Sequence, residues 1–121
     1  MASAASKKSL ADLWVSGFDL SNRRKYTLKN ALGEEVADVY FRAITRSDRL
    51  LINSKVDSDD ALQISTRMLV HKAENEDGTK AFHAADATKL QRELPEEQLN
   101  EIEVFLFGAT GDVDLEEIKN D

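Results

Sequence analysis

Apolar residues in the last third of the chain recur at the spacing of an amphipathic helix. Intervals of three and four residues place four of them on one side of that helix: Leu99, Ile102, Phe105 and Leu106. Pro95 suits the first helical position, glutamates follow in the first turn, and Gly108 and Gly111 end the helix. A shorter helix over residues 86–90 precedes the proline. This region is therefore predicted to pack two helices, and it contains no catalytic motif.

Over residues 25–44 the apolar spacing changes from helical to alternating. Tyr26 and Leu28 alternate with polar residues, and after Gly33 the apolar positions are Val36, Val39, Phe41 and Ala43. β-Branched and aromatic residues on either side of a glycine turn are typical of a β-hairpin. A two-stranded hairpin is marginal alone, so it must pack on helices or on strands of another subunit. An exposed edge would promote self-association, with Val39 as the candidate contact.

A short helix is also predicted near the N-terminus. Ser9 is its expected N-cap, Asp12 follows at the capping-box position, and Gly17 ends the helix. Its apolar side is formed by Leu10, Leu13 and Trp14. Two interpretations of Trp14 and Phe18 remain open: they pack into the core, or they are aromatic anchors that contact a partner.

Two more helices are predicted after the hairpin. Thr45 and Asp48 form a capping-box pattern at the start of the first helix. Asp57 or Ser58 is expected to cap the second helix, which continues to about Lys72. Its predicted apolar side is made of Ala61, Ile64, Met68 and His71, with Leu62 and Leu69 beside it.

The length of the chain sets how these elements are organised. With 121 residues the chain is predicted to form one α+β domain over residues 9–111, mostly helical with an N-terminal β-hairpin. Residues 1–8 are small and polar, and we expect them to be disordered. Residues 112–121 are expected to form an acidic, flexible tail.

The charge and the missing residue types exclude several classes of protein. A net charge of −7 argues against nucleic acid as a partner, because phosphates require a basic surface. The absence of cysteine excludes disulfides and thiolate metal sites. No apolar run approaches the ~20 residues of a membrane span, and the N-terminus lacks the apolar segment of a secretory signal. We therefore expect neither nucleic acid nor a membrane among the partners.

No residue pattern predicts catalysis, a cofactor or a metal. His71 and His83 lack the spacing of a zinc motif. The acidic run at residues 57–60 lacks the glycine and the distant glutamate of a calcium loop. The glycines at residues 108–111 follow a helix, whereas those of a phosphate loop open one. The chain is therefore not expected to be an enzyme, although a hydrolase whose carboxylates converge in the fold is kept as an alternative.

The order of these segments resembles the tail assembly chaperones of long-tailed bacteriophages. A strand ending in VYFRAIT is followed by SDRLL, ALQISTRMLVHKA, NEDGTKAF and LPEEQLNEIEVFLFGATG. The resemblance covers residues 36–111 and departs from the family pattern by an extra residue between Gly78 and Phe82. The segment up to Lys25 carries no part of it. The matching residues are Thr45, Asp48, Arg49, Asp77, Gly78, Phe82, Leu94, Pro95, Leu99 and Ile102.

The resemblance implies a non-enzymatic protein that acts in the host cytoplasm while a tail is being built. Such a protein binds the apolar tape measure protein, keeps it soluble and recruits tail tube subunits. The resemblance also implies self-association and absence from the finished particle. Many members exist in a short form and a longer frameshifted form, and this chain is similar to the short form or to the part that both share.

A chaperone of this kind needs exposed apolar surface surrounded by charge. The candidate partner-binding residues are Leu13, Trp14, Phe18, Val39, Phe105 and Phe107. Packing in the core is the alternative for the aromatic segments. Two alternative functions are a structural virion component, such as a tail terminator or head–tail connector subunit, and an acidic inhibitor of a basic protein.

Overall fold

The computed structural model describes residues 9–56 and 60–108 of the chain. Within these ranges five helices and one hairpin follow one another: α2 (Leu10–Val15), β1 (Arg24–Lys29), β2 (Glu35–Phe41), α3 (Arg46–Lys55), α4 (Ala61–Lys72), α5 (Asp86–Glu93) and α6 (Glu96–Gly108). The predicted α+β class, mostly helical with an N-terminal hairpin, is confirmed. The predictions for residues 1–8 and 112–121 lie outside the described residues.

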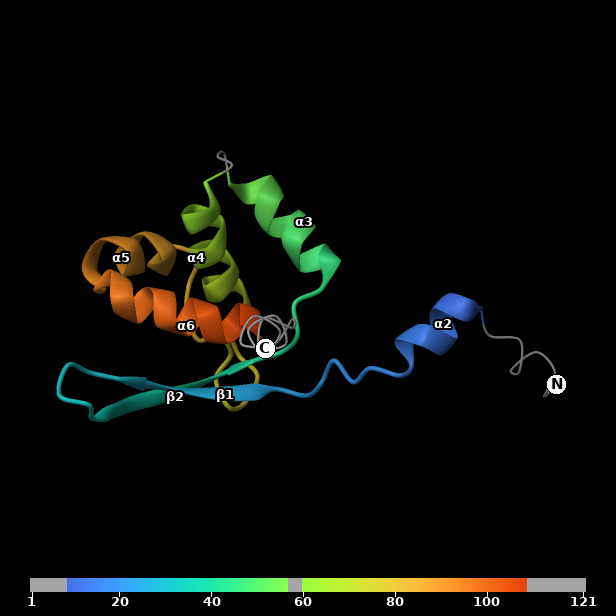
Figure 1. Cartoon of the computed structure of the whole chain (residues 1–121), viewed down its shortest axis with the longest axis horizontal. Helices are drawn as coiled ribbons and strands as arrows, with labels where there is room; N and C mark the ends of the chain where they lie inside the picture. The colour runs from blue at the N-terminus through green and yellow to red at the C-terminus, as the bar shows by residue number, and fades with distance from the viewer. Residues whose placement is uncertain (1–8, 57–59, 109–121) are drawn as a thin grey trace, which may run out of the picture.

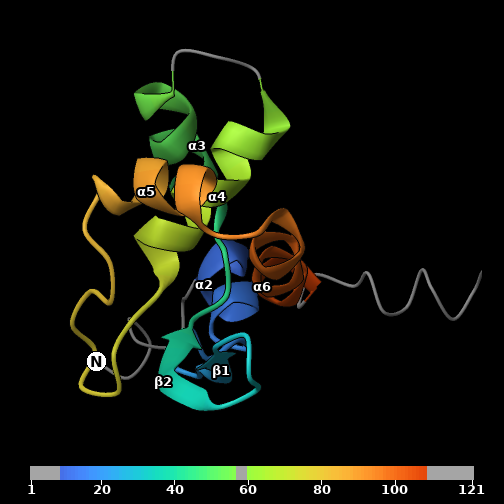
Figure 2. The ribbon, with the colours of Figure 1, turned by 90° about the vertical axis from the view of Figure 1, so that its left-hand side faces the viewer.

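The elements form two layers and one separate helix. Helices α3 to α6 lie together on one face of the hairpin (Figure 1), and the view turned by 90° shows the same helices above the two strands (Figure 2). Helix α2 lies beyond the start of β1, away from the other helices (Figure 1). The hairpin and helices α3 to α6 therefore make up the body of the molecule.

The hairpin is antiparallel, with Tyr26 opposite Val39. Gly33 in its loop has a φ of 80°, a conformation in which a residue with a Cβ is strained. The side-chain oxygen of Asn30 accepts hydrogen bonds from the backbone N–H groups of Leu32 and Glu34, at 2.9 and 3.0 Å. The predicted glycine turn is thus present, and the asparagine side chain replaces backbone partners within it.

The core lies between the inner face of β2 and the helices. Val39 is 3% exposed, so the expectation that it lies on an exposed edge is wrong. Alternation along a strand predicts two faces but not which of them is covered, and here the face of Val39 is covered by helices. The buried apolar cluster consists of Val39, Phe41, Ile52, Met68, Leu69, Ala73, Ile102 and Leu106.

Helix α4 begins later than predicted. Its N-cap is Asp60, whose carboxylate accepts a hydrogen bond from the Leu62 N–H at 2.9 Å. The proposed caps at residues 57 and 58 lie outside the described residues. Of the predicted apolar side, Met68 is fully buried, Ile64 and His71 are half-buried and Ala61 is exposed. The helix thus packs on the core mainly through its second half.

Asp48 ties the start of α3 to the end of α4. The predicted capping box is confirmed: Thr45 accepts a hydrogen bond from the Asp48 N–H, and the Asp48 carboxylate accepts one from the Thr45 N–H. The same carboxylate lies 2.9 Å from Nζ of Lys72 and 3.2 Å from Nε2 of His71. Burial raises the pKa of the Asp48 carboxyl, but the hydrogen bonds from Lys72 and Thr45 outweigh it and lower the pKa to about 2.

Asp48→Asn is expected to lower the free energy of unfolding at neutral pH by about 1–2 kcal/mol. Because the pKa of Asp48 is depressed in the folded protein, its contribution is complete above the ordinary value of 3.8 and is lost as the pH falls towards about 2. Urea unfolding of both proteins at neutral pH and at about pH 2.5 measures this difference. Glu93→Gln, which removes an exposed ion pair on α5, is the control. A deficit of the Asp48 variant that stays constant with pH would contradict the assignment.

Candidate protein-binding surface

Helix α2 begins after a side-chain N-cap, and none of its residues packs into the core. Oγ of Ser9 accepts a hydrogen bond from the Asp12 N–H at 3.1 Å, as the sequence predicted, and Asp12 lies in the first turn, where the helix dipole favours a negative charge. The helix has six residues and buries none of them. Isolated helices shorter than ~12 residues are marginal in water. A partner that covers the apolar side of α2 would therefore also stabilise the helix.

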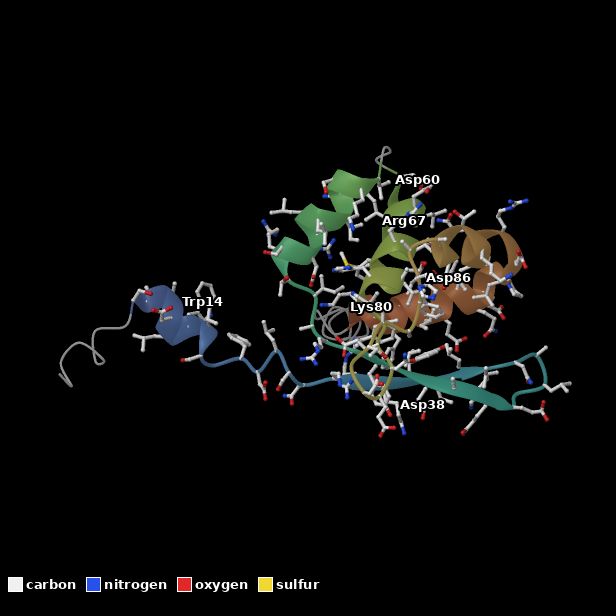
Figure 3. All side chains as sticks on the ribbon, turned by 180° about the vertical axis from the view of Figure 1, so that it is seen from behind. Trp14, Asp38, Asp60, Arg67, Lys80 and Asp86 are labelled. Atoms are coloured by element: carbon white, nitrogen blue, oxygen red, sulfur yellow. The ribbon has the colours of Figure 1, made fainter. Side chains whose placement is uncertain are left out.

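The apolar residues of α2 and of the turn after it are exposed. The side chain of Trp14 is 73% exposed, that of Phe18 66% and that of Leu13 57%. The interpretation that Trp14 and Phe18 pack into the core is therefore wrong. Figure 3 shows Trp14 at one end of the molecule, away from the other helices. We call this segment the apolar arm and define it by Leu10, Leu13, Trp14, Val15, Phe18 and Leu20.

The charges within the arm are few and negative. Asp12 and Asp19 are the charged residues between Ser9 and Asn22. Asp19 accepts hydrogen bonds from the hydroxyl and the N–H of Ser21, which lower the pKa of its carboxyl. The arm therefore suits a partner whose contact segment is apolar and carries little negative charge.

Two arginines fix the point where the arm leaves the body. The guanidinium of Arg23 forms an ion pair with Glu74 at 3.2 Å and donates to the carbonyl oxygens of Asn75 and Glu76. The guanidinium of Arg24 donates to the carbonyl oxygens of Phe105 and Leu106, at 2.8 and 3.1 Å, in the last turn of α6. A cation at a helix C-terminus is favoured by the helix dipole. The chain is thus anchored at residues 23–24, directly after the arm.

Phe105 takes part in the packing of the body. Its half-buried ring lies 5.0 Å from the ring of Tyr26 and 6.1 Å from that of Phe41, measured between centroids. The Arg24 guanidinium lies 4.3 Å from the centroid of the Phe105 ring. Phe107 is also half-buried, with the Arg49 guanidinium 5.7 Å from its ring centroid. These contacts favour the core interpretation of the α6 aromatic residues over partner binding.

Phe105→Ala is expected to lower the free energy of unfolding by about 2–3 kcal/mol, because it removes a ring from two aromatic contacts and from Arg24. Val104→Ala, on the exposed side of the same helix, should change it by less than about 0.5 kcal/mol. Denaturant unfolding of both variants measures the difference. Equal effects of the two substitutions would show that the Phe105 ring does not support the fold.

The structure thus brings together some of the predicted residues and separates others. Leu13, Trp14 and Phe18 share the arm, whereas Phe105 and Phe107 lie on α6 in the body (Figure 1). Sequence reasoning missed Val15 and Leu20, which are 64% and 49% exposed. The signal that could have identified them was their apolar character beside a short capped helix. Their spacing alone placed them neither on the apolar side of that helix nor on its polar side.

A buried carboxyl lies between α4 and α6. Glu103 is 8% exposed, and the Thr66 hydroxyl donates a hydrogen bond to it at 3.0 Å. Burial raises the pKa of the Glu103 carboxyl, and the negative charge of Glu96 adds to this effect. Both glutamates line a depression of about 320 Å³ together with Asp60. The contact with Thr66 gives Glu103 a packing role between the two helices.

Neither a metal cluster nor a membrane-spanning helix is present in residues 9–56 and 60–108. Within these ranges no group of three or more His, Cys, Asp or Glu side chains is placed to hold a metal ion. No helix of the same ranges is long and apolar enough to cross a bilayer.

Comparisons of the chain with protein-family models, curated proteins and solved structures find no match. The exposed apolar arm beside the charged body is the feature that points to a function.

Proposed function

We propose that this protein is a non-enzymatic phage tail assembly chaperone that binds the tape measure protein and recruits tail tube subunits. The exposed apolar arm is the observation that carries the proposal, since six large apolar side chains are presented to solvent on one short segment. The resemblance of residues 36–111 to that family supplies the identity of the partners.

The physical requirements of such a chaperone match the two parts of the chain. A protein that keeps an apolar partner soluble must expose apolar surface and still remain in solution itself. The arm supplies the apolar surface, and the net charge of −7 favours solubility. Because the arm is anchored at Arg23 and Arg24, a bound segment is held directly beside the charged body.

Binding a second partner requires a second surface. Helix α3 presents Leu50 and Leu51, which are 63% and 40% exposed, and we assign tail tube recruitment to this helix. Self-association remains part of the proposal. Its candidate surface is the outer edge of β1, since the sheet of the described residues consists of β1 and β2, and β2 pairs near its end with Glu74. The expected location is the host cell cytoplasm.

Co-expression with the tape measure protein encoded near this chain tests the proposal. We expect the tape measure protein to become soluble and to co-purify with this chain, and we expect purified virions to lack the chain. An unrelated acidic protein of similar size and net charge is the control for a general effect of charge on solubility. An insoluble tape measure protein, together with the chain in purified virions, would favour a structural component of the particle instead.

A further inference from the structure

A second surface depression lies beside α4, next to α3. Helix α3, helix α4 and the loop before α5 enclose a depression of about 320 Å³. Its floor is apolar: Ile52 and Val70 are buried, and Phe82 is half-buried. Its rim is basic, with the side chains of Lys55, Arg67, His71, Lys80 and His83. Five basic side chains around one hollow are unexpected in a chain with a net charge of −7.

Hydrogen bonds to backbone oxygens hold two of these cations in place without neutralising them. Nη1 of Arg67 donates to the carbonyl oxygen of Ala84 at 3.2 Å, and Nζ of Lys80 donates to that of His71. Both hydrogen bonds join the loop to α4. Figure 3 labels Arg67 on α4 and Lys80 in the loop that follows this helix. The two positive charges are therefore positioned by the fold at the rim of the basic pocket.

Some cations of the body are paired with carboxylates. Arg23 and Arg42 pair with Glu74, and Lys72 pairs with Asp48. Within residues 9–56 and 60–108, no carboxylate forms an ion pair with the side chains that carry the positive charge of the rim: Lys55, Arg67 and Lys80.

Two carboxylates lie next to the rim, and each makes its own polar contacts. Asp48 contacts Nε2 of His71 and Nζ of Lys72. Asp86, at the start of α5, accepts a hydrogen bond from the His83 N–H at 2.8 Å. Lys72 balances the charge of Asp48, and the negative charge of Asp86 is outnumbered by the three positive charges of the rim.

We propose that the basic pocket binds a carboxylate that is joined to an apolar body. The apolar body would lie on Ile52, Val70 and Phe82, while Arg67 and Lys80 would donate charge-assisted hydrogen bonds to the carboxylate. Such a group occurs in a free aliphatic acid and at the C-terminus of a peptide that ends in an apolar residue. This site is separate from the arm and does not depend on the function proposed above.

Amide chemical shifts of the full chain, measured during titration with sodium octanoate, test the proposal. We expect saturable shifts at residues 80–84 and at Val70. Arg67→Gln and Lys80→Gln should each weaken octanoate binding about tenfold, since each removes a charged hydrogen-bond donor. Lys89→Gln on the exposed side of α5 is the matched control and should bind like the wild type. Lys55→Gln removes a rim charge without breaking a hydrogen bond of the described residues, so it tests the site even if the loop moves in the other variants.

Acetate and inorganic phosphate distinguish the contribution of the negative charge from that of the apolar body. Both carry negative charge without an apolar body, and we expect them to bind at least about tenfold more weakly than octanoate. Phosphate binding as tight as that of octanoate would overturn the proposed ligand class. Octanoate-induced chemical-shift changes confined to the apolar arm would overturn the proposed site. An equal loss of octanoate affinity in Lys89→Gln and in the pocket variants would also overturn it.

The peptide acetyl-Leu-Phe, with a free carboxylate or as its amide, distinguishes the two sources. Tighter binding of the free-carboxylate peptide than of octanoate would support a protein C-terminus as the ligand, and the reverse order would support a free acid. Equal binding of the peptide and its amide would overturn the role of the carboxylate.

Discussion

Val39→Lys is expected to unfold the body of this protein. Val39 is 3% exposed and belongs to the same buried cluster as Phe41, Met68 and Leu106. A lysine at this position would place an unpaired ammonium group among apolar side chains. We expect the free energy of unfolding to fall by about 4 kcal/mol or more, which is a large part of the stability of a typical small domain.

Circular dichroism during urea unfolding measures this effect, and Val36→Lys is the matched control. Val36 lies on the same strand but is 64% exposed, so its substitution should change the free energy of unfolding by less than about 0.5 kcal/mol. A folded, monomeric Val39→Lys protein with the melting temperature of the wild type would contradict the buried position. That result would favour the prediction from the sequence, in which Val39 lies on an exposed edge and mediates self-association.

The hairpin illustrates what the sequence could predict and what it could not. Alternating residues and Gly33 predicted two strands and their turn, because these signals are local. They did not predict which side of β2 is covered, since that depends on helices that follow it in the chain. Val36 and Val39 are chemically identical, and only the tertiary fold makes one exposed and the other buried.

The helix starts show the same limit in another form. The pairing of Thr45 with Asp48 was predictable because a capping box needs residues three apart. The start of α4 was placed too early because residues 57–60 all have side chains that cap helices, and local chemistry does not choose among them. The basic pocket could not be predicted at all, since its residues come from two helices and a loop.

Leu13→Glu combined with Trp14→Glu is expected to abolish binding to the tape measure protein without loss of stability. Tryptophan is the residue type most enriched in binding hot spots, and losing one such anchor typically weakens binding by at least about thirtyfold. Two carboxylates on the apolar side of α2 would also weaken binding, because an apolar segment that covers them removes them from water without a partner. The melting temperature should stay near that of the wild type, because α2 buries no residue.

Leu62→Glu is the control for this double variant. Leu62 is 65% exposed on α4, so the change adds negative charge at an exposed leucine outside the arm. We expect this variant to bind the tape measure protein like the wild type in a pull-down with both proteins present. Equal binding by the double variant and the wild type would remove the arm from the binding surface. Equal loss in the Leu62 variant would assign the effect to total charge.

The environment of Trp14 in the complex tests the central claim most directly. The chain has one tryptophan, so 5-fluorotryptophan incorporated into this protein alone gives a single ¹⁹F signal from the arm. In the free protein the signal should show the solvent isotope shift of an exposed ring, since Trp14 is 73% exposed. If the arm binds the tape measure protein, addition of that partner will move the signal and remove its sensitivity to D₂O. A complex in which the Trp14 signal stays at its free position and remains accessible to solvent would contradict the account.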